Sequence, residues 1–208
     1  NMPVIVGEVE HKTPVFNHLM TYIEVNPYWN IPPSIAHNEI LAKVQNNPLY
    51  LRQQRIRVFA DWQAGAREIM PESIDWENIG PGIRQFHLRQ DPGPKNSLGT
   101  VKFMFPNNNN VYLHDTPTRG LFQRVRRDFS HGCIRLSRPL DLAAYILGND
   151  FQKVSRQQLQ RQIAGKKQKI FALNAPLPIH LLYHTVWIDR TSGTSYFYDD
   201  IYGRDVPL

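Results

Sequence analysis

Two short segments hold residue types that can carry out nucleophilic catalysis. Residues 112–117 read Tyr-Leu-His-Asp-Thr-Pro, and residues 130–135 read Ser-His-Gly-Cys-Ile-Arg. Cys133 is the one cysteine of the 208 residues, so it has no partner for an internal disulfide. A cysteine attacks as its thiolate, and a catalytic one needs a base or positive charge that lowers the pKa of the thiol below about 8.5. Without these neighbours, a lone cysteine is usually an inert packing residue.

Two histidines are candidates for the base. His131 is two residues from Cys133, where a strand would place both side chains on one face and a turn would not. His114 belongs to the other segment and can approach the thiol through the fold. We favour His114 as the base and keep His131 as a second catalytic candidate.

The residues around the thiol suggest how a substrate is bound. Gly132 permits unusual backbone conformations, and the amides of Gly132 and Cys133 can form an oxyanion hole, in which a donor is worth about 3 kcal/mol. Arg135 is the best candidate for binding a carboxylate with two hydrogen bonds. Tyr112 either lines the cleft or packs in the core. Nearby lie five more arginines and one acid, which are Arg119, Arg124, Arg126, Arg127, Arg138 and Asp128.

Short strands dominate the rest of the pattern. Alternating apolar residues predict the strands 4–9, 20–25, 56–59, 84–89, 101–105, 111–113, 179–188 and 195–198. Helices are predicted from about 35 to 46, from 138 to 147 with Gly148 as the stop, and from 156 to 164 behind a Ser155–Gln158 capping box. The chain is therefore expected to be an α+β protein, mostly antiparallel, with a few helices.

The stretch from about residue 48 to 81 is less regular and is interpreted as an inserted lid subdomain. It contains Trp62, Met70 and Trp76, which either face a substrate cleft or, in our preferred interpretation, pack the insertion onto the core. The chain opens on Asn1 and runs directly into an alternating apolar segment, from which we expect further domains upstream. No apolar run reaches the length of a membrane span.

The sequence also bears on two other classes of function. Net charge is +6, which attracts polyanions, but no nucleic-acid motif accompanies the arginines, so a basic polyanion-binding module is disfavoured and no nucleic-acid partner is expected. His114, His131 and Cys133 could ligate zinc, yet the His-Gly-Cys spacing matches zinc sites poorly. No metal ligands are therefore assigned.

The order Ser130-His-Gly-Cys-Ile-Arg135, with His114 nineteen residues before Cys133, resembles the signature of the L,D-transpeptidase catalytic domain, also called the YkuD domain. Residues 26–33, residues 112–117 and the insertion resemble the larger, lid-bearing enzymes of Gram-negative bacteria. The resemblance covers nearly all of residues 3–200. It implies a YkuD-like mixed β-sandwich or sheet.

The resemblance also implies a function. Cys133 would attack the meso-diaminopimelate carbonyl of a peptidoglycan stem tetrapeptide and release D-alanine, and a diaminopimelate amine of a second stem would resolve the thioester. Water or a lipoprotein lysine is the alternative acceptor, which would make the enzyme a carboxypeptidase, an endopeptidase or a lipoprotein-anchoring enzyme. Carbapenems would acylate the same cysteine, the location would be periplasmic, and no metal or organic cofactor would be required.

One position departs from many smaller family members, which have glycine after the upstream histidine where this chain has Asp115. In the family a backbone carbonyl commonly orients the histidine. The Asp115 side chain is therefore expected to contribute to that orientation, and it is grouped with the substrate-binding candidates. Ser130 is placed in the same group, although its main expected role is to hold the turn.

Overall fold

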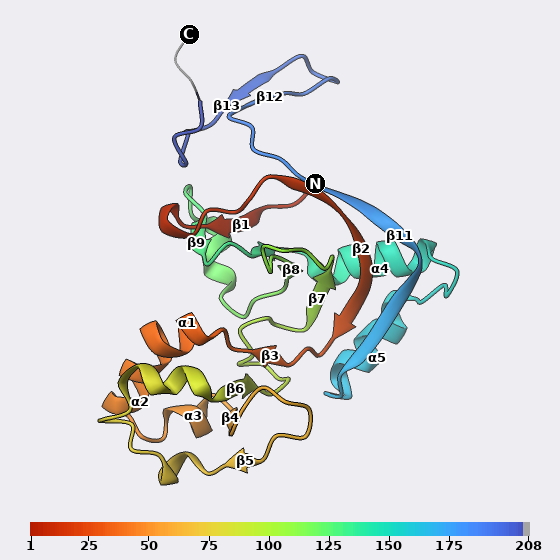
Figure 1. Cartoon of the computed structure of the whole chain (residues 1–208). Coiled ribbons are helices and arrows are strands. Elements are labelled where there is room, and N and C mark those ends of the chain that lie inside the picture. The colour runs from red at the N-terminus through yellow and green to blue at the C-terminus, as the bar shows by residue number, and fades with distance from the viewer. Residues whose placement is uncertain (206–208) are drawn as a thin grey trace.

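The computed structural model describes residues 1–205, and its centre is a seven-stranded mixed sheet (Figure 1). In spatial order the strands are β11 (Lys169–Leu181), β2 (Phe16–Val25), β7 (Val101–Met104), β8 (Leu113–His114), β10 (Ile134–Leu136), β1 (Val4–Gly7) and β9 (Asp128–Ser130). Neighbours are antiparallel except for the pairs β8–β10 and β1–β9. This agrees with the expected mostly antiparallel α+β class.

One face of this sheet is buried under two helices, α4 (Pro139–Asn149) and α5 (Arg156–Ala164), which contact β7 and β2. Alternate residues of β7, Val101 and Phe103, are fully buried on this face together with Leu147 and Leu159 from the helices. Burying one such side chain stabilises the fold by about 1.5–3 kcal/mol. Because side chains alternate along a strand, the residues between them point to the other face.

A second unit, which we call the inserted unit, spans residues 29–90 (Figure 1). Along the chain it lies between β2 and β7, two strands that pair directly with each other in the main sheet. Its sheet has the order β3 (Trp29–Asn30), β6 (His87–Gln90), β4 (Ile56–Phe59) and β5 (Glu68–Ile69). Its helical segments are α1 (Pro33–Ile35), a π-helical turn (Ala36–Ile40), α2 (Leu41–Asn46), α3 (Tyr50–Gln53) and 3-10 turns at Pro71–Ser73 and Gly80–Gln85.

The inserted unit has its own apolar cluster, in which Val58 and Leu88 from the sheet pack with Val44 and Leu51 from the helices. The segment 48–81 lies within this unit. That this unit works as a lid stays a prediction.

The remaining elements are a 3-10 turn at Val9–His11, another at Arg119–Gln123, and a hairpin made of β12 (Val186–Ile188) and β13 (Ser195–Phe197). The hairpin extends away from the sheet beyond the end of β11 (Figure 1). Within residues 1–205, no helix is both long and apolar enough to cross a bilayer.

Several predicted boundaries were wrong. The predicted strand 84–89 begins as a 3-10 turn, and the strand 179–188 is two separate strands. Gly148 does not stop α4, which ends at Asn149. At this end of the helix, the Asp150 N–H donates to the Ile146 carbonyl and the Val154 N–H donates to the Leu147 carbonyl. The short strands β3, β5, β9 and β10 carry too few alternating residues to be recognised in the sequence.

The Ser155 capping box should stabilise α5 as predicted from sequence, since Ser155 Oγ accepts from the Gln158 N–H at 3.2 Å and Gln158 Oε1 accepts from the Ser155 N–H at 2.7 Å. We expect Ser155→Ala to lower the free energy of unfolding by about 1 kcal/mol, measured by urea denaturation. Gln160→Ala, at an exposed position of the same helix, is the control and should cause no loss. Equal stability of the two variants would contradict this role of the cap.

Candidate active site

The two segments that carry the candidate catalytic residues, 112–117 and 130–135, lie side by side and form the parallel strand pair β8–β10. Leu113 is paired with Ile134 and His114 with Arg135, and the Ile134 N–H donates to the Tyr112 carbonyl at 3.1 Å. Leu113 and Ile134 are buried in the helix-covered core. Alternation therefore turns the side chains on either side of them to the opposite face of the sheet.

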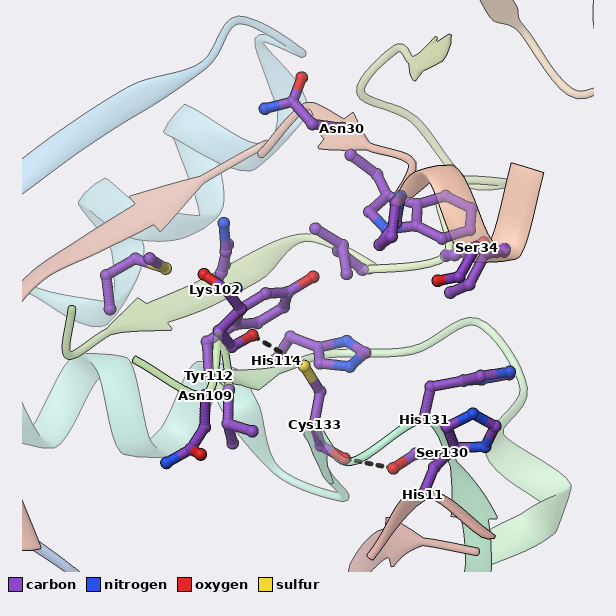
Figure 2. A pocket seen from close by; sticks show the side chains of 18 of the residues that line it. His11, Asn30, Ser34, Lys102, Asn109, Tyr112, His114, Ser130, His131 and Cys133 are labelled. Atoms are coloured by element: carbon purple, nitrogen blue, oxygen red, sulfur yellow. Dashed lines mark hydrogen bonds between the residues drawn. The ribbon is translucent and has the colours of Figure 1, made fainter. Parts of the chain in front are cut away.

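That opposite face carries a cavity of about 800 Å³ between the main sheet and the inserted unit. Cys133, His114, Tyr112 and Arg135 all line it, so the structure brings these four predicted residues together. Figure 2 shows the imidazole of His114 beside the thiol of Cys133. Of the arginines named from the sequence, Arg135 alone lines the cavity.

His114 is held in a neutral form suited to accept a proton. Its Nδ1 lies 2.5 Å from the Asp115 carbonyl, which can only accept, so Nδ1 carries the hydrogen and Nε2 is left as the acceptor. Burial, with the positive charge of Arg135 as a further cause, lowers the pKa of His114 from 6.5 to about 3. The ring is therefore uncharged at neutral pH.

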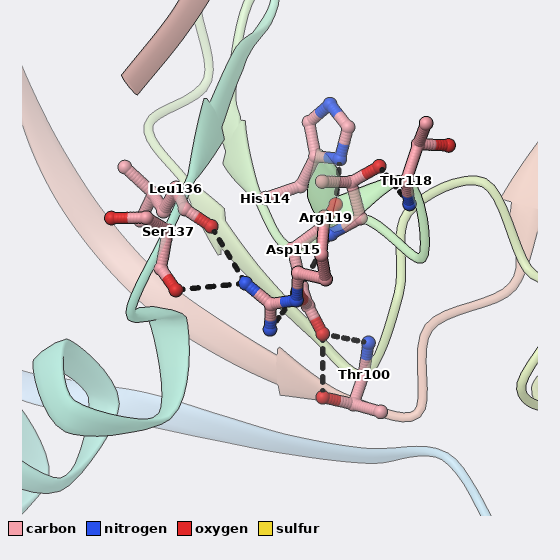
Figure 3. A network of polar contacts seen from close by, with 8 residues as sticks. Thr100, His114, Asp115, Thr118, Arg119, Leu136 and Ser137 are labelled. Atoms are coloured by element: carbon pink, nitrogen blue, oxygen red, sulfur yellow. Dashed lines mark hydrogen bonds and ion pairs between the residues drawn. The ribbon is translucent and has the colours of Figure 1, made fainter. Parts of the chain in front are cut away.

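The side chain of Asp115 does not orient His114, which corrects the sequence expectation. It accepts from the N–H and hydroxyl of Thr100, both at 2.9 Å, and from the N–H of Thr116 at 2.7 Å, and it pairs with Arg119 at 2.9 Å (Figure 3). Its carboxylate is buried and does not line the cavity, so its contacts are with the protein and not with a substrate.

The Asp115 network fixes the backbone that orients His114. Arg119 also donates to the Ser137 carbonyl at 2.8 Å, which ties the segment after β8 to the segment after β10. Gly99 has a φ of 61°, and a Cβ there would lie 2.4 Å from Cγ of Asp115. The aspartate thus acts through the backbone carbonyl, as a positioning residue.

The turn before the thiol depends on Gly132 and Ser130. Gly132 has a φ of 100°, a conformation that side chains rarely adopt. Ser130 is buried, donates its hydroxyl hydrogen to the Cys133 carbonyl, and accepts from the Gly132 N–H at 3.2 Å. The Gly132 amide is therefore already used, which corrects its assignment to an oxyanion hole and leaves the Cys133 amide as the predicted donor. These contacts support the turn-holding role of Ser130.

Cys133 is half-buried at the cavity wall, with Sγ 3.8 Å from the Asn110 carbonyl. Burial raises the pKa of its thiol, and hydrogen bonding to Tyr112 and the charges of Lys102 and Arg135 offset this only in part. A lowered pKa was expected from the sequence, whereas burial in the structure raises the pKa of the thiol and lowers that of the neighbouring imidazole, which favours the uncharged form of both groups.

Lys102 is a site residue that the sequence argument missed. It pairs with His114 across β7 and β8, and its ammonium lies 4.3 Å from the centre of the Tyr112 ring. Burial lowers the pKa of Lys102, and burial raises that of Tyr112 well above 10. Alternation with the buried Val101 and Phe103 was a usable signal for its orientation, but the sequence did not reveal which face held the site.

Arg135 is the cationic group best placed for a substrate carboxylate. Burial lowers the pKa of its guanidinium, and the buried Nε has no hydrogen-bond partner among the described residues. An unpartnered buried donor is costly, and a carboxylate bound in the cavity would satisfy it.

His131 does not lie with His114. Figure 2 shows its ring directed away from the thiol of Cys133, and its Nε2 lies 2.9 Å from Glu39 Oε1 of the inserted unit. Its ring also faces that of His11, with centroids 4.8 Å apart. Within residues 1–205, His114, His131 and Cys133 do not together form a group of converging metal-ligand atoms, so the zinc site that combined these three residues has no structural support.

The large apolar residues Trp62, Met70 and Trp76 of the inserted unit have different surroundings in the structure. Trp76 is buried in the unit's apolar cluster. Trp62 is 46% exposed, stacks on His87 with ring centroids 4.3 Å apart, and lines the cavity. Met70 is 69% exposed. The interpretation that these residues pack the insertion onto the main core is therefore wrong, because Trp76 packs within the inserted unit's own cluster and Trp62 lines the cavity.

Comparison with known proteins agrees with this site. The family model of the L,D-transpeptidase catalytic domain, YkuD, matches residues 1–168, and the chain belongs to that family. It is 34% identical over 202 residues to a protein of Haemophilus influenzae named "Putative L,D-transpeptidase". The match covers 97% of this chain and 40% of that relative, so the chain spans well under half the length of the protein it resembles.

The carboxylate of Asp115 is buried although its partner Arg119 is half-exposed, so it should matter more to stability than a carboxylate in a fully exposed pair. We expect Asp115→Ala to lower the free energy of unfolding by about 3 kcal/mol, because the buried N–H of Thr116 and the half-buried donors of Thr100 lose their acceptor. The control is Asp141→Ala, which removes the exposed Asp141–Arg156 pair and should change stability little. Urea denaturation measures both, and similar losses would refute the argument.

The neutral state of the thiol and imidazole predicts how reactivity depends on pH. The rate of Cys133 alkylation by iodoacetamide should rise with pH with a midpoint above about 8.5, because the thiolate forms only above the raised pKa. No step is expected between pH 5 and 7, since His114, with its pKa near 3, stays neutral there. A rate that is already at its plateau from pH 5 to 8 would indicate a thiolate–imidazolium pair and contradict this assignment.

Two variants test whether the charge of Lys102 contributes to the pH midpoint of Cys133 alkylation. Lys102→Met should move the midpoint to higher pH, because the lysine charge lowers the pKa of the thiol. Arg124→Met, which removes an exposed charge outside the cavity, should leave the midpoint in place.

Proposed function

We propose that this chain is a cysteine L,D-transpeptidase that acts on peptidoglycan stem peptides, with Cys133 as nucleophile and His114 as general base. The observation that carries the proposal is the register of β8 and β10, which puts both side chains on the wall of one cavity. Membership of the YkuD family supports the same chemistry.

In the proposed acylation step, the proton of the Cys133 thiol passes to Nε2 of His114 as the sulfur attacks the carbonyl of meso-diaminopimelate in a stem tetrapeptide. A sulfur–carbon bond forms, and the amide bond to D-alanine breaks. The proton held by His114 goes to the leaving amine. Lys102 and Arg135 line the same cavity, and their positive charges would favour the negative charge that develops in this step.

In the second step, the side-chain amine of a diaminopimelate residue in another stem attacks the thioester. His114 takes a proton from this amine, and the sulfur leaves as a thiol, which restores the enzyme and yields a direct crosslink. Arg135 would bind the carboxylate of a stem peptide through its guanidinium. The inserted unit would act as the lid over the bound peptides, and the enzyme would work in the periplasm.

The acyl-enzyme can be trapped directly. Incubation with a carbapenem should add the mass of one inhibitor to the wild type in intact-protein mass spectrometry, and should add none to Cys133→Ala. His114→Ala should acylate about 10²–10⁴-fold more slowly, as expected when a general base is lost. His180→Ala, on the exposed part of β11, is the matched control and should react at the wild-type rate.

The same protein tested with purified stem tetrapeptides identifies the acceptor. A crosslinked dimer with loss of D-alanine supports the proposed reaction, a trimmed tripeptide indicates water as the acceptor, and a peptide linked to a lipoprotein lysine indicates protein anchoring. Crosslinks formed by a folded Cys133→Ala protein would refute the cysteine mechanism altogether.

A further inference from the structure

At the mouth of the same cavity, three side chains present donor atoms of the kinds that bind transition metals. Glu8, His11 and His131 each offer one such atom, and these atoms all lie within 4.8 Å of one another. His11 and His131 also line the cavity. We propose that this cluster binds one divalent transition-metal ion of the zinc type. The proposal does not depend on the acyl-transfer reaction.

The donor set selects the class of ion. Two imidazoles and one carboxylate are ligands typical of Zn²⁺, whereas Mg²⁺ and Ca²⁺ prefer oxygen ligands alone. In a tetrahedral site with bonds of about 2.1 Å, donor atoms lie about 3.4 Å apart. The widest separation in the cluster, at most 4.8 Å, must therefore shorten by up to about 1.4 Å. The side chains of His11 and Glu8 are 50% and 41% exposed and so have room to rotate.

The backbone holds the three ligands together before an ion binds. The Glu8 N–H donates to the Ser130 carbonyl at 2.9 Å, directly before His131, and the His11 N–H donates to the Glu8 carbonyl at 3.0 Å. Thr13 Oγ1 donates to the Gly132 carbonyl at 2.9 Å, directly after His131. The two segments that supply the ligands are thus fixed to each other on both sides of the cluster.

Gly7 explains how these segments come so close. A Cβ at this position would lie 2.0 Å from the His11 carbonyl oxygen and 3.0 Å from the Cα of Gly132. Only glycine admits this packing without a shift of the backbone. The approach of the His11 turn to the segment of His131 is therefore built into the fold.

Glu39 of the inserted unit lies beside His131 but outside the three converging donor atoms, so its side chain would have to move to become a fourth ligand. Glu39 Oε1 lies 2.9 Å from His131 Nε2, yet this buried oxygen has no hydrogen bond of good geometry among the described residues. With Glu8 it would supply two negative charges for a divalent cation. An ion bound by Glu39 and by His131 would connect the inserted unit to the main sheet across the mouth of the cavity.

The test uses the Cys133→Ala protein, because a thiolate in the same cavity is itself a zinc ligand. Isothermal titration with zinc chloride should show one ion per chain. His11→Gln and His131→Gln in this background should each weaken binding at least tenfold, and Glu39→Gln should weaken it as well. His18→Gln, an exposed histidine of β2 outside the cluster, is the control and should bind zinc like the parent.

Circular dichroism establishes that each variant is folded, and X-ray absorption of the zinc-loaded parent should show two imidazole ligands. Failure of the parent to bind zinc at 100 µM, or zinc affinity in His11→Gln and His131→Gln equal to that of the parent, would overturn the site. Unchanged affinity in Glu39→Gln would overturn the connection between the inserted unit and the sheet.

Discussion

The parallel register of β8 and β10 is the constraint on which the candidate site depends. It pairs Leu113 with Ile134 and His114 with Arg135, so the two apolar residues enter the core beneath α4 and α5. Because side chains alternate between the two faces along a strand, those of His114, Cys133 and Arg135 then point to the opposite face. A shift of one residue would exchange the faces and bury charged and reactive groups under the helices. Core packing and site geometry are therefore set by the same hydrogen bonds.

Burial decides the electrostatics of this face. Removing groups from water disfavours their charged forms, which is why the pKa of the Cys133 thiol is raised and that of His114 is lowered. The charges of Lys102 and Arg135 act in the direction of a thiolate without outweighing burial. A carboxylate bound by Arg135 would enter a site whose cations are Lys102 and Arg135, while burial favours the uncharged forms of Cys133 and His114. The resting site thus keeps its reactive pair uncharged.

The loops around His114 and Cys133 are held by polar contacts that do not involve the thiol or the free ring nitrogen of the histidine. Asp115 fixes the backbone whose carbonyl sets the tautomer of His114, and Ser130 closes the turn whose glycine precedes Cys133. The inserted unit leaves and rejoins the main sheet between neighbouring strands, and it brings Glu39 and Trp62 to the cavity. These residues shape the surroundings of His114 and Cys133.

The sequence by itself determined the chemical identity of the site. Gly132 and Cys133 form a local pattern and helix α5 carries a local cap, so these could be predicted from neighbours in the chain. His114, nineteen residues before Cys133, was predicted from its residue type and from a spacing that resembles the family signature. The tertiary structure alone decided which polar groups meet across strands. Lys102 lies beside Tyr112 and His114. His131 lies beside His11 and Glu39. The Asp115 carbonyl orients the ring of His114. The reason is physical: pairing register and burial arise between segments distant in sequence, and no local pattern encodes the dielectric environment or the partner that a side chain will meet.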